Sequence, residues 1–222
     1  MRLTLFDLDG TLLTGDSDHA FGEFLIDRGW VDAAPYRARN DSFYADYATG
    51  TLDIDAYVDF ATHAWRDRSA DELLQASRAF VASHVLPMVL PAARALVERH
   101  RAAGDELAIV TATNDFVTRP LAELFGISTL IATQLARDAQ GRVLGHIDGV
   151  PAFRNGKVQR VQQWLASRSR TLADYERCTF YSDSANDLPL LEHVSHPVAT
   201  NPGPDLARIA AARGWPILKL HP

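Results

Sequence analysis

Two acidic segments are the clearest candidates for chemistry in this sequence, because each follows a short apolar run. Asp7 and Asp9, in DLDGT, come after LTLF, and Asp183 and Asp187, in SDSANDLPLL, come after TFY. Such runs predict buried strands, and ligands of parallel sheets bind outside the carboxyl ends of the strands. Paired carboxylates at such an edge suit a hard divalent cation and can supply a nucleophile. A turn at Asp9-Gly10 and helix capping near Asp187 are the plainer interpretations of the same residues.

Thr111 and Lys157 add two groups that suit an anionic ligand. Thr111 ends the predicted strand IVT, and a hydroxyl followed by the amides of a helix N-terminus can hold a phosphate, although a threonine can also end a strand without a ligand. Lys157 opens a predicted helix, where a lysine is usually solvated. Only two of the 22 basic residues are lysines, Lys157 and Lys219, so arginine has replaced lysine almost everywhere else. A lysine is a compact point charge, which suits a tight site of carboxylate and phosphate oxygens.

The composition excludes several other classes of protein. The 222 residues carry 22 basic and 28 acidic side chains, a net charge of −6, and 47% of them are hydrophobic, which allows a sizeable core. An acidic chain without a basic stripe is not expected to bind nucleic acid. The single cysteine, Cys178, excludes an intrachain disulfide, and no apolar stretch approaches the roughly 20 residues of a membrane span. The start MRLTLFDLDG does not resemble a secretory signal, so we expect a cytoplasmic protein.

The elements that would position these groups alternate between strands and helices. Apolar runs predict strands over 3–6, 106–111, 129–133, 178–182, 196–200 and 216–218. Apolar periodicity predicts helices over 92–103, 115–125, 157–167 and 205–213, and a hairpin turn is expected at 137–142. This alternation predicts an α/β fold with a doubly wound parallel sheet.

Residues 16–85 interrupt the alternation, because they contain no convincing strand-like run. They predict about four helices, over 17–29, 33–48, 53–65 and 69–84, inserted after the first strand. The chain is therefore expected to divide into a core, residues 1–15 and 86–222, and an all-helical insert, residues 16–85. The insert carries 13 acids and 6 arginines, a net charge of −7, whereas the remainder carries 15 acids and 16 basic residues, a net charge of +1.

The four polar segments, in this order, resemble the motifs of the haloacid dehalogenase-like phosphatase superfamily. DLDGT resembles the first motif, Thr111 the second, Lys157 the third and SDSANDLPLL the fourth. A helical insert directly after the first motif is similar to that of the phosphoserine-phosphatase-like branch. The resemblance implies a Rossmann-like core with a helical cap, and an enzyme that hydrolyses phosphomonoesters.

The same resemblance implies roles for the carboxylates. Asp7 would be the nucleophile that forms an aspartyl-phosphate, and Asp9 would be the general acid for the leaving alcohol and then the base for water. Asp7, the backbone carbonyl of Asp9 and Asp183 would bind Mg2+, with Asp187 in support. Phosphoryl transfer depends mainly on positioning and charge neutralisation, which agrees with these roles.

Thr111 and Lys157 would hold the phosphoryl group, and Lys157 would also screen the nucleophile from the negative phosphate. The substrate would be a small phosphorylated metabolite, and the acidity of the insert favours one with a cationic group beside its phosphate. Histidinol phosphate, a phosphoserine-like compound and a phosphoethanolamine-type compound are the candidates. Asp16 and Asp18 are the insert acids nearest the first motif, so they are expected to contact the ammonium group, unless they only begin a solvated helix.

Two observations concern the choice between functions. Asp16 stands where phosphoserine phosphatases carry a glutamate, but Ala61 falls near the position of their substrate-binding arginine, which argues against phosphoserine itself. The alternative function is a phospho-accepting regulatory domain of the response-regulator receiver type, which also uses an aspartate, Mg2+, a threonine and a lysine. A receiver has no acid at the position of Asp9 and no helical insert, so we expect turnover instead. The oligomeric state stays open.

Overall fold

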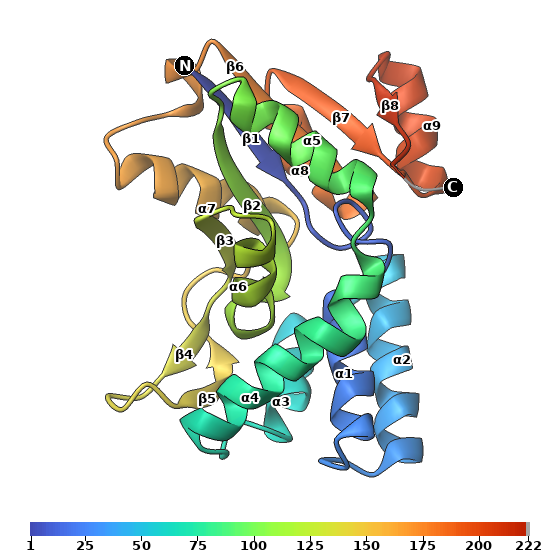
Figure 1. The fold of residues 1–222 in the computed structure, drawn as a ribbon. Coiled ribbons are helices and arrows are strands. Elements are labelled where there is room, and N and C mark those ends of the chain that lie inside the picture. Colours follow the sequence, from blue (N-terminus) through green and yellow to red (C-terminus); the bar gives the residue numbers. More distant parts are fainter. Residues whose placement is uncertain (221–222) are drawn as a thin grey trace.

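The computed structural model describes residues 1–220 and contains a six-stranded sheet in the order β3-β2-β1-β6-β7-β8 (Figure 1). Every pair of neighbouring strands in it is parallel. The order reverses between β1 and β6, which is where doubly wound sheets bind ligands. The predicted fold is confirmed, with strands at β1 (Arg2–Phe6), β2 (Glu106–Asn114), β3 (Thr129–Thr133), β6 (Arg177–Ser182), β7 (His196–Thr200) and β8 (Ile217–Leu218).

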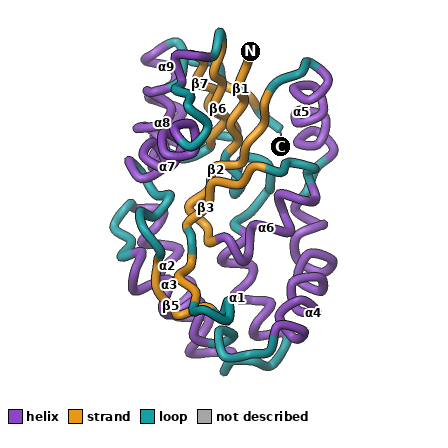
Figure 2. Tube along the Cα trace, turned by 90° about the vertical axis from the view of Figure 1, so that its left-hand side faces the viewer, coloured by secondary structure: helices purple, strands orange, loops and turns teal. Residues whose placement is uncertain are grey.

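Helices cover both faces of this sheet (Figure 2). One face carries α5 (Pro91–Ala102) and α6 (Asp115–Leu124), and the other carries α7 (Asn155–Ala166), α8 (Leu188–His193) and α9 (Pro204–Arg213). Side chains of β1 alternate between the two resulting cores: Phe6 packs into the first, and Leu3 and Leu5 pack into the second. Burial on both faces explains why the strands are nearly continuous apolar runs in the sequence.

The helical insert, residues 16–85, contains helices and the loops that join them, and it contains no strand. The helices are α1 (Ser17–Asp27), α2 (Ala33–Thr49), α3 (Ile54–His63) and α4 (Ala70–Phe80), followed by a π-helical turn over Val81–Val85. Polar side chains begin three of them, because Asp16, Asp53 and Ser69 each accept a hydrogen bond from a backbone amide of the first turn. The segments that flank the insert are joined by an antiparallel bridge between Leu13 and Val89. None of the helices formed by residues 1–220 is long and apolar enough to span a bilayer.

A hairpin of β4 (Leu135–Arg137) and β5 (Val143–Ile147) leaves the core after β3 and packs against α3 of the insert (Figure 1). Its turn includes Gly141, as the sequence predicts. The short 3-10 turns of the chain lie at Leu86–Met88, Leu172–Asp174 and Ala185–Asp187.

Aromatic side chains join the insert to the core. Trp65 is 1% exposed, and its ring stacks on that of Phe116 in α6 with 4.2 Å between the centroids. Phe21 meets the same Phe116 ring edge-on at 5.9 Å. The insert therefore shares one apolar core with this face of the sheet.

Candidate active site

A buried lysine joins two of the predicted carboxylates. Asp7 directly follows β1, Lys157 lies in the first turn of α7, and Asp187 precedes α8. The Lys157 Nζ donates to Asp7 Oδ1 and to Asp187 Oδ2, both at 2.7 Å. All three side chains are almost completely buried, with Lys157 only 1% exposed. A buried charge needs such partners, because desolvation alone would disfavour it strongly.

The ionisation of this group follows from burial and from its neighbours. Burial disfavours the charged lysine, but the carboxylates of Asp187 and Asp7 outweigh that effect and raise the pKa of Lys157 above its ordinary value. Burial raises the pKa of Asp187 to about 6, although Lys157 and the hydroxyl of Ser182, which donates at 2.7 Å, both act in the opposite direction. The lysine therefore stays protonated between its two carboxylates.

Asp183 lies beside Asp7 at the carboxyl end of the neighbouring strand, β6. The Thr11 hydroxyl lies 3.4 Å from Asp7 Oδ2 and 3.2 Å from Asp183 Oδ1, so it spans the two carboxylates. Gly10, at φ +70°, allows this approach, because a methyl group there would overlap the Asp183 carboxylate. Burial, followed by the negative charges of Asp7 and Asp187, raises the pKa of Asp183 well above its ordinary value.

The donor chemistry of this edge of the sheet suits a hard divalent cation. Among residues 1–220, no three carboxylate, imidazole or thiol groups are already spaced to hold a metal ion. The carboxylates of the buried Asp7 and the half-buried Asp183 repel one another, and Lys157 contacts only the first of them. Oxygen ligands of this kind are those that Mg2+ prefers, and a bound cation would remove the repulsion. The residues present therefore fit the expected metal.

The Asp9 carboxylate is held by hydrogen bonds from the start of α1 and from the end of β2. Its Oδ1 accepts a hydrogen bond from the Ser17 amide at 2.6 Å, and its Oδ2 accepts one from the Thr113 hydroxyl at 3.0 Å. Burial, and then the negative charge of Asp16, raises the pKa of Asp9 to about 7. A carboxyl group with this pKa can both donate and accept a proton near neutral pH.

The surroundings of Thr111 differ from the prediction. The strand β2 continues through Thr111 to Asn114, with an irregular register after Val110, and α6 begins only at Asp115. The expectation that Thr111 ends a strand and that helix amides follow it directly is therefore wrong. The irregular pairing keeps the chain extended for three more residues, and the Thr111 hydroxyl accepts from the Thr113 amide at 3.2 Å. Thr111 still lines the same pocket as Asp7.

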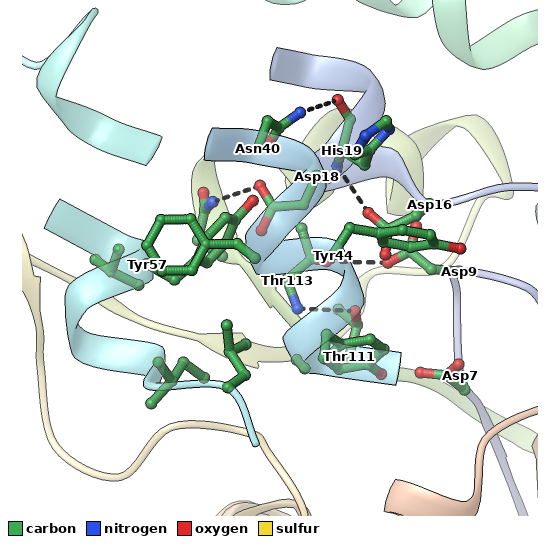
Figure 3. Close-up of a pocket in the computed structure, with 17 residues that line it drawn as sticks. Asp7, Asp9, Asp16, Asp18, His19, Asn40, Tyr44, Tyr57, Thr111 and Thr113 are labelled. Carbon is green, nitrogen blue, oxygen red and sulfur yellow. Dashed lines mark hydrogen bonds between the residues drawn. The ribbon is translucent and has the colours of Figure 1, made fainter. Parts of the chain in front are cut away.

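Asp16 and Asp18 also line this pocket, together with Asp7 and Asp9 (Figure 3). Asp16 is the N-cap of α1 and accepts from the His19 amide at 2.7 Å, and it lines the pocket as well, so it does more than begin a solvated helix. Asp18 accepts from the side-chain amide of Asn114 at 3.3 Å. Burial, and then the negative charges of Asp16 and Asp9, raises the pKa of Asp18 well above its ordinary value. The remaining wall is largely apolar and aromatic, and it includes Phe43, Tyr44, Tyr47, Leu52, Ile54, Tyr57 and Val58.

Several polar residues of the site were not predicted. Thr11 was present in the DLDGT motif and could have been included, and Thr113 lies two residues after Thr111, on the same face of a strand. Ser182 likewise opens the quoted motif SDSANDLPLL, whereas Asn114 carries no comparable signal, because it acts on a residue of the insert that only the fold brings to it. Ser182 contacts Asp187 across a turn, and Asn114 contacts Asp18 of the insert.

Comparisons with known proteins identify relatives of this chain. The family model described as haloacid dehalogenase-like hydrolase matches residues 4–192. A histidinol-phosphatase of Neisseria meningitidis serogroup C (strain 8013) is 46% identical over 217 residues, which are 98% of both chains. A crystal structure of a protein with unknown function from Bordetella pertussis Tohama I is 45% identical and superposes with a TM-score of 0.93 over 99% of both chains.

A more distant structure shares the fold alone. A substrate-bound phosphoserine phosphatase is 16% identical and superposes with a TM-score of 0.68, over 97% of this chain and 91% of its own. The extent of the family match and the identity to the Neisseria protein identify the present chain as an enzyme of the phosphatase type. The chain belongs to the haloacid dehalogenase-like hydrolase family.

Proposed function

We propose that the chain is a Mg2+-dependent phosphomonoesterase that acts on a small phosphorylated metabolite through an aspartyl-phosphate on Asp7. The observation that carries this proposal is the buried contact of Lys157 with Asp7 and Asp187, next to the carboxylate of Asp183. A carboxylate cannot approach an anionic phosphate until its charge is compensated; Lys157 compensates part of the charge of Asp7, and a bound Mg2+ would compensate the rest.

Each step of the reaction is assigned to a side chain. A carboxylate oxygen of Asp7 attacks the phosphorus, the bond from phosphorus to the ester oxygen breaks, and Asp9 gives its proton to the leaving alkoxide. Asp9 then takes a proton from water, whose oxygen attacks the phosphorus. The bond from Asp7 to phosphorus breaks, which releases inorganic phosphate and restores the carboxylate. The pKa of about 7 at Asp9 supports both proton transfers.

The remaining motif residues bind and neutralise. Thr111 and Lys157 hold the oxygens of the phosphoryl group, and Lys157 also compensates the charge of Asp7. Asp7, the backbone carbonyl of Asp9 and Asp183 would hold Mg2+, with Asp187 in support, and the ion would supply positive charge beside the transferred phosphoryl group.

Replacement of the nucleophile tests this assignment. Asp7→Asn is expected to abolish hydrolysis of p-nitrophenyl phosphate, because an amide cannot form the phosphoenzyme. Asp205→Asn is the matched control, since the Asp205 side chain is 81% exposed and does not line the pocket. Full activity of Asp7→Asn, with circular dichroism showing the native fold, would end the proposal.

We also propose that the substrate is an amino-alcohol phosphate, with histidinol phosphate as the first candidate. Four aspartates line the pocket together with His19, and Lys157, which contacts Asp7, is already paired with both Asp7 and Asp187. The Neisseria relative named a histidinol-phosphatase, at 46% identity, supports the same choice. Asp16 and Asp18 would contact the nitrogen groups of this substrate, and the aromatic wall would pack against its ring.

A panel of phosphate esters tests the substrate class. Histidinol phosphate is expected to be hydrolysed with a higher kcat/KM than phosphoserine, phosphoethanolamine, glycerol phosphate or glucose phosphate. Asp18→Asn should raise the KM for histidinol phosphate and leave the rate with p-nitrophenyl phosphate nearly unchanged, since the latter has no cationic group. Equal rates on amino-alcohol and neutral sugar phosphates would contradict the assignment.

We further propose that residues 16–85 act as a cap domain over a catalytic core of residues 1–15 and 86–222. The pocket supports this division, because its lining combines Asp16, Asp18 and Tyr57 of the insert with Asp7 and Thr111 of the core. A cap in this place would exclude bulk water from the aspartyl-phosphate until the alcohol leaves.

A further inference from the structure

The residue that precedes α7 has an unusual backbone conformation. Arg154 has φ +52° and ψ −122°, a region that favours glycine and that side-chain-bearing residues rarely adopt. Its carbonyl oxygen accepts the amide of Lys157 at 3.1 Å, so the conformation of Arg154 helps to determine where the first turn of α7 begins. Strained residues of this kind persist only where surrounding contacts hold them.

The contacts that hold Arg154 come from the helical insert and from the loop after β6. Its guanidinium donates to the carbonyl of Gly50, at the end of α2, and its Nε donates to Asn186 Oδ1 at 3.4 Å. The side-chain amide of Asn186 donates in turn to the carbonyl of Tyr47 at 3.0 Å. Tyr47 also lies against the ring of Phe153, with 5.8 Å between the centroids. We call these five residues the α2 latch; Figure 2 shows α2 on the side of the molecule that carries α7 and α8.

The latch joins residues that are adjacent to the buried charges. Arg154 lies three positions before Lys157, and Asn186 lies directly before Asp187. The Lys157 Nζ and the Asp187 Oδ2 are themselves 2.7 Å apart. The latch is therefore separated from the buried charges by one helical turn on one side and by one peptide bond on the other.

We propose that Arg154 is a positioning residue that uses the docked end of α2 to place Lys157 against Asp7 and Asp187. When α2 is docked, its Gly50 carbonyl anchors the guanidinium, and the strained turn presents the Lys157 ammonium to both carboxylates. When α2 is undocked, Arg154 relaxes and the start of α7 moves with it. The inference rests on the proposed function, because it concerns the group that would bind the phosphoryl oxygens.

Replacement of Arg154 by glycine separates positioning from stability. Arg154→Gly removes the side chain and also removes the backbone strain, because glycine adopts positive φ readily. We expect kcat with p-nitrophenyl phosphate to fall about tenfold, as small displacements of catalytic groups do, while the thermal unfolding midpoint stays equal to or above that of the wild type. An unchanged kcat, or a loss of kcat that is accompanied by a lower midpoint, would overturn the proposal.

The insert side of the latch offers a matched pair of glycines. Gly50 and Gly29 both have positive φ, +73° and +66°, but an added methyl group would overlap the Arg154 guanidinium only at Gly50 and would meet nothing within 4 Å at Gly29. Gly50→Ala is therefore expected to lower kcat as Arg154→Gly does, and Gly29→Ala is not. The double variant Gly50→Ala/Arg154→Gly should be no slower than the worse single variant, because both changes break one interaction. If the losses of kcat in the two single variants add up in the double variant, the latch is contradicted.

Hydrogen exchange tests the latch without any activity. Exchange of the backbone amides of residues 47–52 and 155–158 should become faster in Arg154→Gly and stay unchanged in Gly29→Ala. If the wild-type chain hydrolyses no phosphomonoester but Arg154→Gly shows this faster exchange, the proposed function fails and the latch stands. Unchanged exchange in Arg154→Gly overturns the latch whatever the activity.

Discussion

At the scale of single residues, the lysine at position 157 shows why residue type matters. The chain carries twenty arginines and two lysines, yet the buried cation of the site is a lysine. A guanidinium is a wide planar fork, whereas an ammonium can sit between two carboxylates that approach it at 2.7 Å, one from the end of β1 and one from the turn before α8. The scarcity of lysine in the sequence and the position of Lys157 between two carboxylates both indicate that this site requires a lysine.

We predict that Lys157→Arg loses kcat/KM by at least about a hundredfold, because the larger head group displaces the Asp7 carboxylate by a distance that catalysis does not tolerate. The matched control is Lys219→Arg, which replaces the other lysine at an exposed position near the C-terminus. Steady-state kinetics on both variants provides the measurement. A Lys157→Arg enzyme within a factor of two of the wild type would show that only the charge matters here.

At the scale of secondary structure, the first turn of α7 depends on a glycine that the sequence does not mark as special. Gly156 has no unusual φ, but an added methyl group would overlap the backbone carbonyl of Pro151. This close approach lets the loop of residues 150–154 fold back onto the helix start, and it brings Lys157 into the sheet edge.

Gly156→Ala is accordingly expected to destabilise the protein by about 1–3 kcal/mol, as overpacking at a backbone contact does, and to lower activity because Lys157 moves with the turn. Gly203→Ala is its control, since Gly203 also stands at a helix start but has no neighbour within 4 Å of an added methyl group. Its cost should remain below about 1 kcal/mol. Urea unfolding of both variants gives the comparison, and equal stabilities would contradict the role assigned to Gly156.

At the scale of the whole molecule, the acidic insert and the core contribute carboxylates to one pocket. The helical insert carries the negative charge excess of the chain, and its Asp16 and Asp18 line the same pocket as Asp7 and Asp9. Such a concentration of buried carboxylates is costly without cations. In the proposed function, Mg2+ beside Asp7 and the nitrogen groups of the substrate beside Asp16 and Asp18 would supply the compensating positive charge.

Removal of the metal is expected to have two effects. Treatment with EDTA should abolish phosphatase activity, and added Mg2+ should restore it. Mg2+ at a hundred times its Kd should also stabilise the fold by about 2.7 kcal/mol, because it binds the folded chain alone, and the unfolding midpoint should therefore rise by roughly 5–10 °C. Asp183→Asn should lose this Mg2+-dependent shift. Activity that survives exhaustive removal of divalent cations would contradict the proposal.

The sequence by itself determined the elements, their order and the chemical types of the site residues. Strand runs such as LTLF and the helical periodicity of the insert depend on neighbours a few positions away, so they are visible without a structure. The same locality explains the one error at Thr111, because the irregular pairing of β2 with β3 extends the strand to Asn114 and no local signal records that pairing.

Only the tertiary structure decided which groups face one another. Lys157 meets Asp7 across 150 positions of the chain, Asn114 meets Asp18 across 96, and Arg154 meets Gly50 across 104. The pKa of about 7 at Asp9 likewise depends on burial and on Asp16 of the insert. Distances, burial and ionisation arise when remote segments pack together, and they are therefore properties of the fold rather than of any one segment.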